Sequence, residues 1–311
     1  MTRGSNRPVL IAATGALCIA FSAIFVRLAD VSPSTAAVYR CVYALPALGA
    51  LALWERRRYG PRGAGQQRLA LIAGLLFAAD LIFWHNAIDY VGAGLATVLG
   101  NTQVVLVGLL AWLVLGEKPS ARLLLATPVV MVGVVFISGV VGEGAYGSNP
   151  ALGVLYGVLT GIAYSGFILI LRQGNKDIRR PAGPLFDATL VAALASTAAG
   201  SALGDLTLEP VWPSHGWLIA LALSSQVLGW LLISVSLPRL PAALTSVVLT
   251  LQPLGSVLLG IVLLGEEPSG VQLAGGAVVV AGLIVATVRR PDRAPVAPLE
   301  GAPPESGQAG G

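Results

Sequence analysis

The sequence predicts an all-α integral membrane protein with ten transmembrane helices, arranged as two inverted five-helix repeats. Three observations carry this prediction: the composition, a series of long apolar runs and an internal duplication. Apolar residues make up 55% of the 311 residues and charged residues only 11%, whereas an average soluble domain is about a quarter charged. The chain is therefore expected to lie in a membrane.

The apolar runs are each about 18 to 24 residues long, and a helix needs roughly 20 apolar residues to cross the hydrocarbon core of a bilayer. Short loops separate them, so no sizeable soluble domain is predicted. The first run could instead be a secretory signal peptide, but it is longer than the usual apolar core and lacks a small-x-small cleavage site. The ten runs cover residues 9–29, 37–54, 69–88, 93–115, 120–141, 151–171, 184–204, 216–237, 241–264 and 270–288.

The duplication is visible in one short string, because VLGEKPSA at residues 114–121 returns as LLGEEPSG at residues 263–270. At this offset, 15 of 47 positions are identical between residues 91–137 and residues 240–286. Such self-similarity indicates an internal duplication. The chain is accordingly divided into an N-terminus over residues 1–8, a first repeat over 9–141, a second repeat over 150–289 and a tail over 290–311, whose Pro, Gly and Ala content predicts disorder.

Basic residues collect in alternate loops. With the N-terminus in the cytoplasm, 17 of the 19 Lys and Arg residues fall on the cytoplasmic side, and only Arg27 and Arg40 lie near outer helix ends. Loops rich in Lys and Arg are retained on the cytoplasmic side of a membrane. We therefore expect a multi-pass protein of the cell membrane with both termini cytoplasmic. The two copies are offset by five spans. Because an odd number of spans reverses the direction of the chain through the membrane, the second copy is inverted relative to the first. Inverted repeats are a recurrent build of secondary transporters, because two equivalent halves can exchange inward-open and outward-open shapes.

The duplicated Gly-Glu-x-Pro-Ser string, at residues 116–120 and 265–269, also has a local interpretation. Gly ends one helix and Pro fits near the start of the next, so each copy predicts a tight turn between adjacent spans. In the inverted topology the Glu117 turn lies on the cytoplasmic side and the Glu266 turn lies outside. The two glutamates are expected at the membrane interface, with no catalytic role.

Three stretches carry a resemblance to a known family: VYRCVYALP at residues 38–46, GAGLATVLGNTQVVLVGLLAWLVLGEKPS at 92–120 and LPAALTSVVLTLQPLGSVLLGIVLLGEEPS at 240–269. Over about residues 9–290 the chain resembles the EamA-type permeases of the drug/metabolite transporter superfamily. The resemblance implies two EamA-like repeats of five helices with a central cavity between them. It also implies secondary transport of a small organic metabolite, amino-acid-like or drug-like, by alternating access. Export is the expected direction, with an uptake permease or a passive channel as the alternative.

Polar side chains inside spans mark the predicted substrate path, because exposing them to lipid is costly. Gln103 and Gln252 correspond in the two repeats and lie near mid-membrane, and Pro253 removes a helix hydrogen bond beside Gln252. These glutamines have two equally good explanations: hydrogen bonding between helices and contact with the substrate. Thr245 and Ser256 share a helical face with Gln252. The predicted substrate-binding residues are Gln103, Gln252, Tyr164, Trp84, Thr245 and Ser256.

Three ionisable side chains in the spans, Asp80, His85 and Arg40, are predicted to couple transport to protons or to a charged solute. Asp80 and His85 belong to DLIFWHNAIDY at residues 80–90, where the family resemblance implies mostly apolar or aromatic residues. We expect Asp80, near mid-membrane, to carry a proton or to pair with a cationic group of the solute. The alternative is a structural ion pair with Arg40. His85 is turned about 140° from Asp80 around the helix, so the two need not act together.

Two further patterns lie within the predicted spans. Gly153, Gly157 and Gly161 recur at four-residue spacing, which predicts close helix packing more than a pore lining. Gln226 and Trp230 lie one helical turn apart and could meet a solute.

Several functional classes lack the residues that they require. The string AYSG at residues 163–166 gives half of a serine-protease motif, but no His is placed to act as its base. Cys18 and Cys41 each fall inside a span and indicate neither a disulfide nor a metal site. No metal-ligand spacing, phosphate-binding loop or nucleotide-binding domain is recognisable in the sequence. We therefore expect no enzyme activity, cofactor, metal or nucleic-acid partner. The expected partners are a small-molecule substrate and the lipid bilayer, and the oligomeric state stays open.

Overall fold

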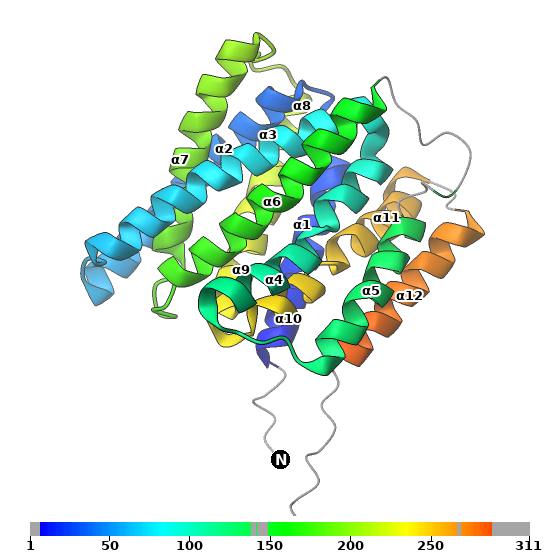
Figure 1. The fold of residues 1–311 in the computed structure, drawn as a ribbon. Helices are drawn as coiled ribbons and strands as arrows, with labels where there is room; N and C mark the ends of the chain where they lie inside the picture. The colour runs from blue at the N-terminus through cyan, green and yellow to red at the C-terminus, as the bar shows by residue number, and fades with distance from the viewer. Residues whose placement is uncertain (1–6, 138–140, 142–148, 266–268, 288–311) are drawn as a thin grey trace, which may run out of the picture.

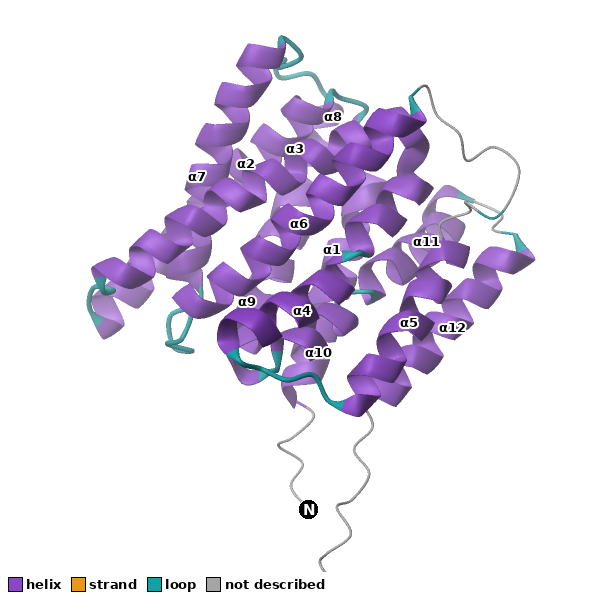
Figure 2. Ribbon diagram, in the orientation of Figure 1, coloured by secondary structure: helices purple, strands orange, loops and turns teal. Residues whose placement is uncertain are grey.

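A computed structural model describes residues 7–137, 141, 149–265 and 269–287, and each regular element in these residues is a helix (Figure 1). Loops and turns join the described helices (Figure 2). Most of the predicted N-terminus, the predicted tail and Glu266 lie outside the described residues. The elements are α1 Arg7–Ala29, α2 Pro33–Tyr59, α3 Ala64–Asn101, α4 Gln103–Leu115, α5 Ala121–Ile137, α6 Pro150–Gly174, α7 Ala182–Leu203, α8 Ser214–Leu221, η1 Ala222–Gly229, α9 Trp230–Ser236, η2 Leu237–Arg239, α10 Ala242–Val248, α11 Leu251–Leu264 and α12 Gly270–Thr287.

Helix ends follow the local sequence. Helix α2 begins after Ser32, whose hydroxyl accepts a hydrogen bond from Thr35 N, and Pro33 takes the first helical position, where its missing N–H has no helical partner to lose. Gly116 and Gly265 end α4 and α11 with φ angles of 69° and 66°, in the left-handed region that glycine tolerates best. The predicted helix stop is thus confirmed in both copies of the duplicated string.

Helix α3 contains the third predicted run and the start of the fourth. In a straight helix Trp84 and Gly100 would lie about 24 Å apart, yet a Cβ atom built on Gly100 would lie 3.9 Å from Trp84 Cδ1. The chain therefore reverses direction between these two residues. The membrane-length part of α3 ends at Tyr90, whose carbonyl accepts from Asn149 N just before α6. The remainder of α3 and α4 form the returning segment.

Two other predicted runs are interrupted helices. The run over Ser214–Arg239 consists of α8, the π-helical η1, α9 and the 3₁₀ turn η2. The next run separates into α10 and α11. Pro253 has no N–H for Leu249 O, and this carbonyl accepts instead from Gln252 N at 3.0 Å. The loosening predicted beside Gln252 is therefore confirmed.

Seven described segments are long and apolar enough to cross a membrane, and three shorter apolar helices cover the remaining predicted runs. Large apolar side chains on the outer surface, such as Leu113 and Val262, are 69% and 78% exposed, as expected where lipid takes the place of water as the solvent. The chain has the helical architecture of a multi-pass membrane protein. The seven long segments are Arg7–Ala29, Pro33–Tyr59, Ala64–Tyr90, Ala151–Gly174, Ala182–Leu203, Ser214–Arg239 and Ala242–Leu263, and the shorter helices are Leu99–Leu115, Ala121–Phe136 and Leu273–Ala286.

Helices from the two predicted repeats pack against one another. Helix α2 packs on α7, α5 on α12 and α3 on α6, while α1 packs on η1, α9 and α11. The pairing of α5 with α12 is plain at one edge of Figure 1. Gly157 and Gly161 lie so close to Leu99 and Thr102 that an added Cβ atom would overlap these side chains. The glycine spacing in α6 therefore serves helix packing, as predicted.

Candidate central binding site

A buried polar chain links α2, η1 and α7. Arg40 is 4% exposed, and its Nε donates to Gln226 Oε1 at 3.1 Å. Gln226 Nε2 in turn donates to Thr189 Oγ1 at 3.1 Å. Both Gln226 and Thr189 are fully buried. A charge buried among helices needs hydrogen-bond partners, and this chain of amide and hydroxyl groups supplies them to the Arg40 cation.

Aromatic rings from α3, α6 and α9 pack beside this chain. Phe77 stacks on Phe167 with ring centres 4.6 Å apart, and Trp230 meets the two rings edge-on at 5.8 Å and 4.8 Å. Tyr164 meets Trp230 edge-on at 6.0 Å. The Arg40 guanidinium lies 5.9 Å from the centre of the Phe77 ring, a distance at which the ring face attracts a cation. A cation and a group of aromatic faces therefore lie together in the interior.

Asp80 belongs to the same region. It lies three residues after Phe77 on α3 and is 8% exposed. The described residues form no Arg40–Asp80 ion pair, and Arg40 Nε bonds to Gln226 instead. The ion pair considered as an alternative from the sequence is therefore not the arrangement in the structure. We call Arg40, Gln226, Thr189, Asp80, Phe77, Phe167, Trp230 and Tyr164 the central cluster.

His85 has a different setting from Asp80. His85 Nδ1 lies 2.6 Å from Leu81 O, one turn back in the same helix, and the His85 ring meets the Trp84 ring at 5.0 Å. Its Nε2 is buried and has no hydrogen-bond partner in the described part of the chain. His85 is thus bonded within its own helix, and its predicted part in charge coupling stays a prediction.

Gln103 and Gln252, which correspond in the two repeats, both reach across to another segment. Gln103 Nε2 donates to Ser246 O at 3.2 Å, and Gln252 Nε2 donates to Tyr164 Oη at 3.2 Å. The sequence left two interpretations of these glutamines, interhelical hydrogen bonding and substrate contact. The interhelical hydrogen bonds are present in the structure. Gln103 Oε1 is buried and has no partner among the described residues, so this amide still has an acceptor to satisfy.

Thr245, Ser256 and Trp84 do not share a polar face with one another in the structure. Thr245 Oγ1 donates to Pro241 O at 3.2 Å in its own helix, and Ser256 Oγ donates to Ala20 O of α1 at 2.8 Å. Trp84 packs beside Gly100, where α3 returns on itself. The predicted stripe of Thr245, Gln252 and Ser256 assumed one continuous helix, and the break between α10 and α11 interrupts it.

A second polar arrangement joins the ends of several helices on the side of the first Gly-Glu-x-Pro-Ser turn. Glu117 Oε1 lies 2.5 Å from Arg172 Nη1, and Glu117 Oε2 accepts from Ala242 N at 3.2 Å. Arg172 Nε donates to Leu237 O at 3.0 Å. These contacts, which we call the Glu117 link, fasten the ends of α4 and α6 to the turn between η2 and α10. Sequence reasoning placed Glu117 at the membrane interface and missed this link.

Sequence reasoning also missed part of the central cluster. Gln226 and Trp230 were noted without being placed in the predicted site, although an amide in the middle of an apolar run was a usable signal. Thr189 gave no signal, because threonine hydroxyls within helices commonly bond to their own backbone. Ser165 does so here, since its Oγ donates to Gly161 O at 2.6 Å. The AYSG serine is thereby tied to its own helix.

Comparisons with known proteins identify the family. The EamA-like transporter family matches residues 6–139 and again residues 151–288. A solved structure described as "Crystal structure of protein" matches with a TM-score of 0.75 at 19% sequence identity, covering 91% of this chain and 97% of that chain. At this identity the likeness shows the fold alone. A search of curated proteins found no match. The two family matches, which together span most of the sequence, show that the chain belongs to the EamA-like transporter family of the drug/metabolite transporter superfamily.

Proposed function

We propose that the protein is a secondary active transporter that moves a small organic metabolite across the cell membrane by alternating access, in the direction of export. The observation that carries this proposal is the central cluster. Arg40, Asp80 and Phe77 come from the first predicted repeat, whereas Gln226, Thr189 and Trp230 come from the second. A polar site shared by two repeats in the interior of a helical membrane protein is the usual place for a transported solute.

The packing supports two inverted repeats of five spans. If the repeats are equivalent, α6 corresponds to α1, the segment α8–η1–α9 corresponds to α3, and α11 corresponds to α4. The packing of α3 on α6 should then be matched by packing of α8, η1 and α9 on α1. The packing of α4 on α6 should be matched by packing of α11 on α1. Both pairs of contacts are present. The breaks between α3 and α4 and between α10 and α11 also come just before Gln103 and Gln252, at matching places in the duplication. Discontinuous helices of this kind form substrate sites in many transporters.

The chemistry of the central cluster favours a partly apolar solute that carries charge. Arg40 offers a cation for a carboxylate, Asp80 offers a carboxylate for an ammonium group or a proton, and the rings beside them offer apolar faces. An amino-acid-like metabolite fits all three, and a cationic drug-like molecule fits the last two. We propose Gln103 and Gln252 as further contacts, because they lie beside the helix breaks and Gln252 also bonds to Tyr164 of the central cluster.

The Glu117 link supports a carrier over the alternative of a passive channel. It fastens helices from both predicted repeats at one end of the bundle, as a gate would in a protein that opens one side at a time. An uptake permease of the same fold remains a second candidate, because the same site and gate serve either direction. Export in this proposal comes from the family resemblance.

The topology can be tested with single cysteines at Ser120 and Ser269 in a cysteine-free background. The proposal places these residues on opposite sides, with both termini and Ser120 in the cytoplasm. An impermeant thiol reagent added to whole cells should label the cysteine at position 269 and leave the one at position 120 unlabelled until the cells are opened. Equal labelling of both positions from outside would refute the inverted arrangement.

The role of the central charge can be tested in proteoliposomes under an imposed pH gradient. A metabolite comparison of cells with and without the gene first identifies a candidate solute. We expect Asp80→Asn to abolish its gradient-driven transport while folded yield is retained, and Arg40→Gln to weaken solute affinity. If Asp80→Asn keeps gradient-driven transport and solute affinity while only lowering folded yield, Asp80 is a structural residue and its proposed coupling role is wrong.

A further inference from the structure

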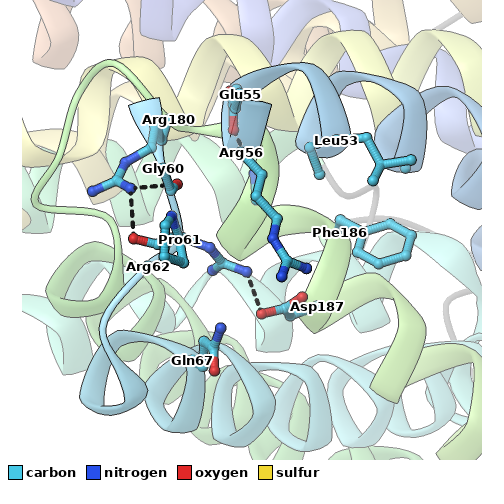
Figure 3. A pocket seen from close by; sticks show the side chains of 13 residues that line it. Leu53, Glu55, Arg56, Gly60, Pro61, Arg62, Gln67, Arg180, Phe186 and Asp187 are labelled. Atoms are coloured by element: carbon cyan, nitrogen blue, oxygen red, sulfur yellow. Dashed lines mark hydrogen bonds and ion pairs between the residues drawn. The ribbon is translucent and has the colours of Figure 1, made fainter. Parts of the chain in front are cut away.

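A pocket away from the central cluster lies where α2 ends, α3 begins and α7 begins. It has a volume of about 350 Å³, within the range of pockets that hold small ligands. Figure 3 shows two unlike walls: Leu53 and Phe186 form an apolar side, whereas Arg56 and Arg62 project into the polar side. The pocket is therefore amphipathic, with apolar and cationic surfaces facing the same space.

Most of the charged groups around the pocket have structural partners. Glu55 accepts from Ala182 N and Gly183 N, at 2.9 Å and 2.8 Å, and so caps the start of α7. Arg180 Nη1 donates to Gly60 O and Pro61 O, each at 3.0 Å, and so holds the turn after α2. These contacts engage Glu55 and Arg180 in holding the backbone and leave the binding capacity of the pocket to other side chains.

Two arginines retain unused donors. Arg62 Nη2 lies 2.5 Å from Asp187 Oδ2, but Arg62 Nη1 is buried and has no partner in the described part of the chain. The Arg56 guanidinium reaches from α2 toward the same place (Figure 3). Arg56 is exposed, and its guanidinium forms no ion pair with any described residue. A buried guanidinium donor without a partner, next to a second guanidinium that is free of ion pairs, favours an anion, because the N–H groups of arginine form charge-assisted hydrogen bonds to phosphate oxygens.

The flanking residues place the pocket at the membrane surface. Trp54 and Tyr59 are 58% and 38% exposed and meet edge-on, as in the aromatic belts that lie at headgroup depth. Arg57 and Arg58 follow Arg56 in the same basic turn, which the positive-inside rule assigns to the cytoplasmic leaflet. An anion at this depth beside an apolar wall is most simply the phosphate of a lipid.

We propose that this pocket binds the phosphate headgroup of an anionic phospholipid of the cytoplasmic leaflet. The phosphate contacts Arg56 and Arg62 Nη1, and the glycerol end of the acyl chains lies against Leu53 and Phe186. Basic pockets between transmembrane helices on the cytoplasmic side recognise acidic lipids in this way. The site is separate from the central cluster, so it does not depend on the proposed transport function, whereas its assignment to the cytoplasmic leaflet rests on the proposed topology.

Lipid retention by the full chain tests this site. The protein is purified from membranes containing phosphatidylglycerol and phosphatidylcholine, and lipid bound after detergent washing is measured by native mass spectrometry. Arg56→Gln should lower retained phosphatidylglycerol about tenfold or more, whereas Arg57→Gln, an equal charge change outside the pocket, should lower it by no more than about fivefold. Thermal unfolding of each variant verifies that it is folded.

A second arm separates a lipid from a free phosphate ion. Delipidated protein is titrated with short-chain phosphatidylglycerol and, separately, with inorganic phosphate, and the shift in unfolding temperature is recorded. We expect the lipid to stabilise the wild type more than phosphate does, and Arg56→Gln to remove that difference. Equal stabilisation by both ligands, equal retention of the two phospholipids, or equal losses in Arg56→Gln and Arg57→Gln would overturn the proposal.

Discussion

The Glu117 link should hold one end of the helix bundle closed, and replacing Glu117 with glutamine should loosen it. The glutamate makes two contacts, with Arg172 Nη1 at 2.5 Å and with Ala242 N at 3.2 Å. A hydrogen bond to a charged group contributes about 1.5 to 3 kcal/mol when buried and less than about 1 kcal/mol when exposed. Because the Glu117 side chain is 33% exposed, we expect a loss of about 1 to 2 kcal/mol, which is a roughly fivefold to thirtyfold shift toward the open end.

The shift can be measured by thiol accessibility at Ala243. This residue lies in α10 against α4, where a Cβ atom on Gly108 would be 3.6 Å from the Ala243 Cβ. In a background without native cysteines, a cysteine at position 243 should react with an impermeant reagent from the Glu117 side about five to thirty times faster in Glu117→Gln than in the parent. Lys118→Gln, a charge change in the same turn, is the control and should leave the rate unchanged.

An unchanged labelling rate in Glu117→Gln, with the same folded yield as the parent, would refute the reasoning. Arg172→Gln supplies an internal check, because it removes the other partner of the same contact. If the two side chains act as one unit, the double variant should react no faster than the faster single variant. Additive effects would mean that Glu117 and Arg172 act separately.

Three further predictions follow from the packing and the charges. Gln226→Leu should lower the free energy of unfolding by about 1 to 3 kcal/mol, because Arg40 Nε loses its acceptor; Gln226→Glu, which keeps an acceptor, should unfold at a higher temperature than Gln226→Leu. Gly157→Ala should destabilise the protein by about 1 to 3 kcal/mol through overlap in the helix interface, whereas Gly65→Ala, in open space on α3, should stabilise it by about 0.5 to 1 kcal/mol; both are read from chemical unfolding in detergent. Hydrogen bonds from the neighbouring arginines lower the pKa of Asp177 to about 2. The stability that wild type has over Asp177→Asn at neutral pH should therefore persist below pH 4 and disappear only as the pH falls toward 2. A stability difference already lost at pH 4 would contradict this prediction.

Features set by neighbouring residues could be predicted from the sequence. Apolar run length located the helices, because crossing a bilayer demands a minimum length whatever the tertiary contacts are. Gly116 and Gly265 predicted helix ends through their backbone freedom, and Pro253 predicted a weakened helix through its missing donor. The glycines of α6 predicted close packing because their spacing keeps them on one face. Each of these inferences needs only a few consecutive turns of chain.

Features that depend on distant partners could not be predicted. Arg40 and Gln226 are separated by 186 residues, and polarity in two apolar runs does not say which side chains meet. The hydroxyls of Thr245 and Ser256 looked available from their spacing, but nearby carbonyls satisfy both. Within the described residues, three predicted spans are apolar helices of only 10–17 residues, and the first of them is short because the chain reverses direction between Trp84 and Gly100. The contacts of the central cluster could therefore be seen only in the structure. Most of its polar members could still be noticed in the sequence, as polar residues within apolar runs.

Counterflow in proteoliposomes tests the central claim, transport of a small organic solute by alternating access, most directly. Vesicles containing the purified protein are loaded with the metabolite that accumulates in cells lacking the gene, and entry of a labelled trace of the same metabolite is followed. A carrier should give saturable entry that is accelerated by unlabelled solute inside, and Asp80→Asn should reduce it while protein-free vesicles show none. Entry that rises linearly with concentration and gains nothing from internal solute would contradict alternating access and indicate a channel.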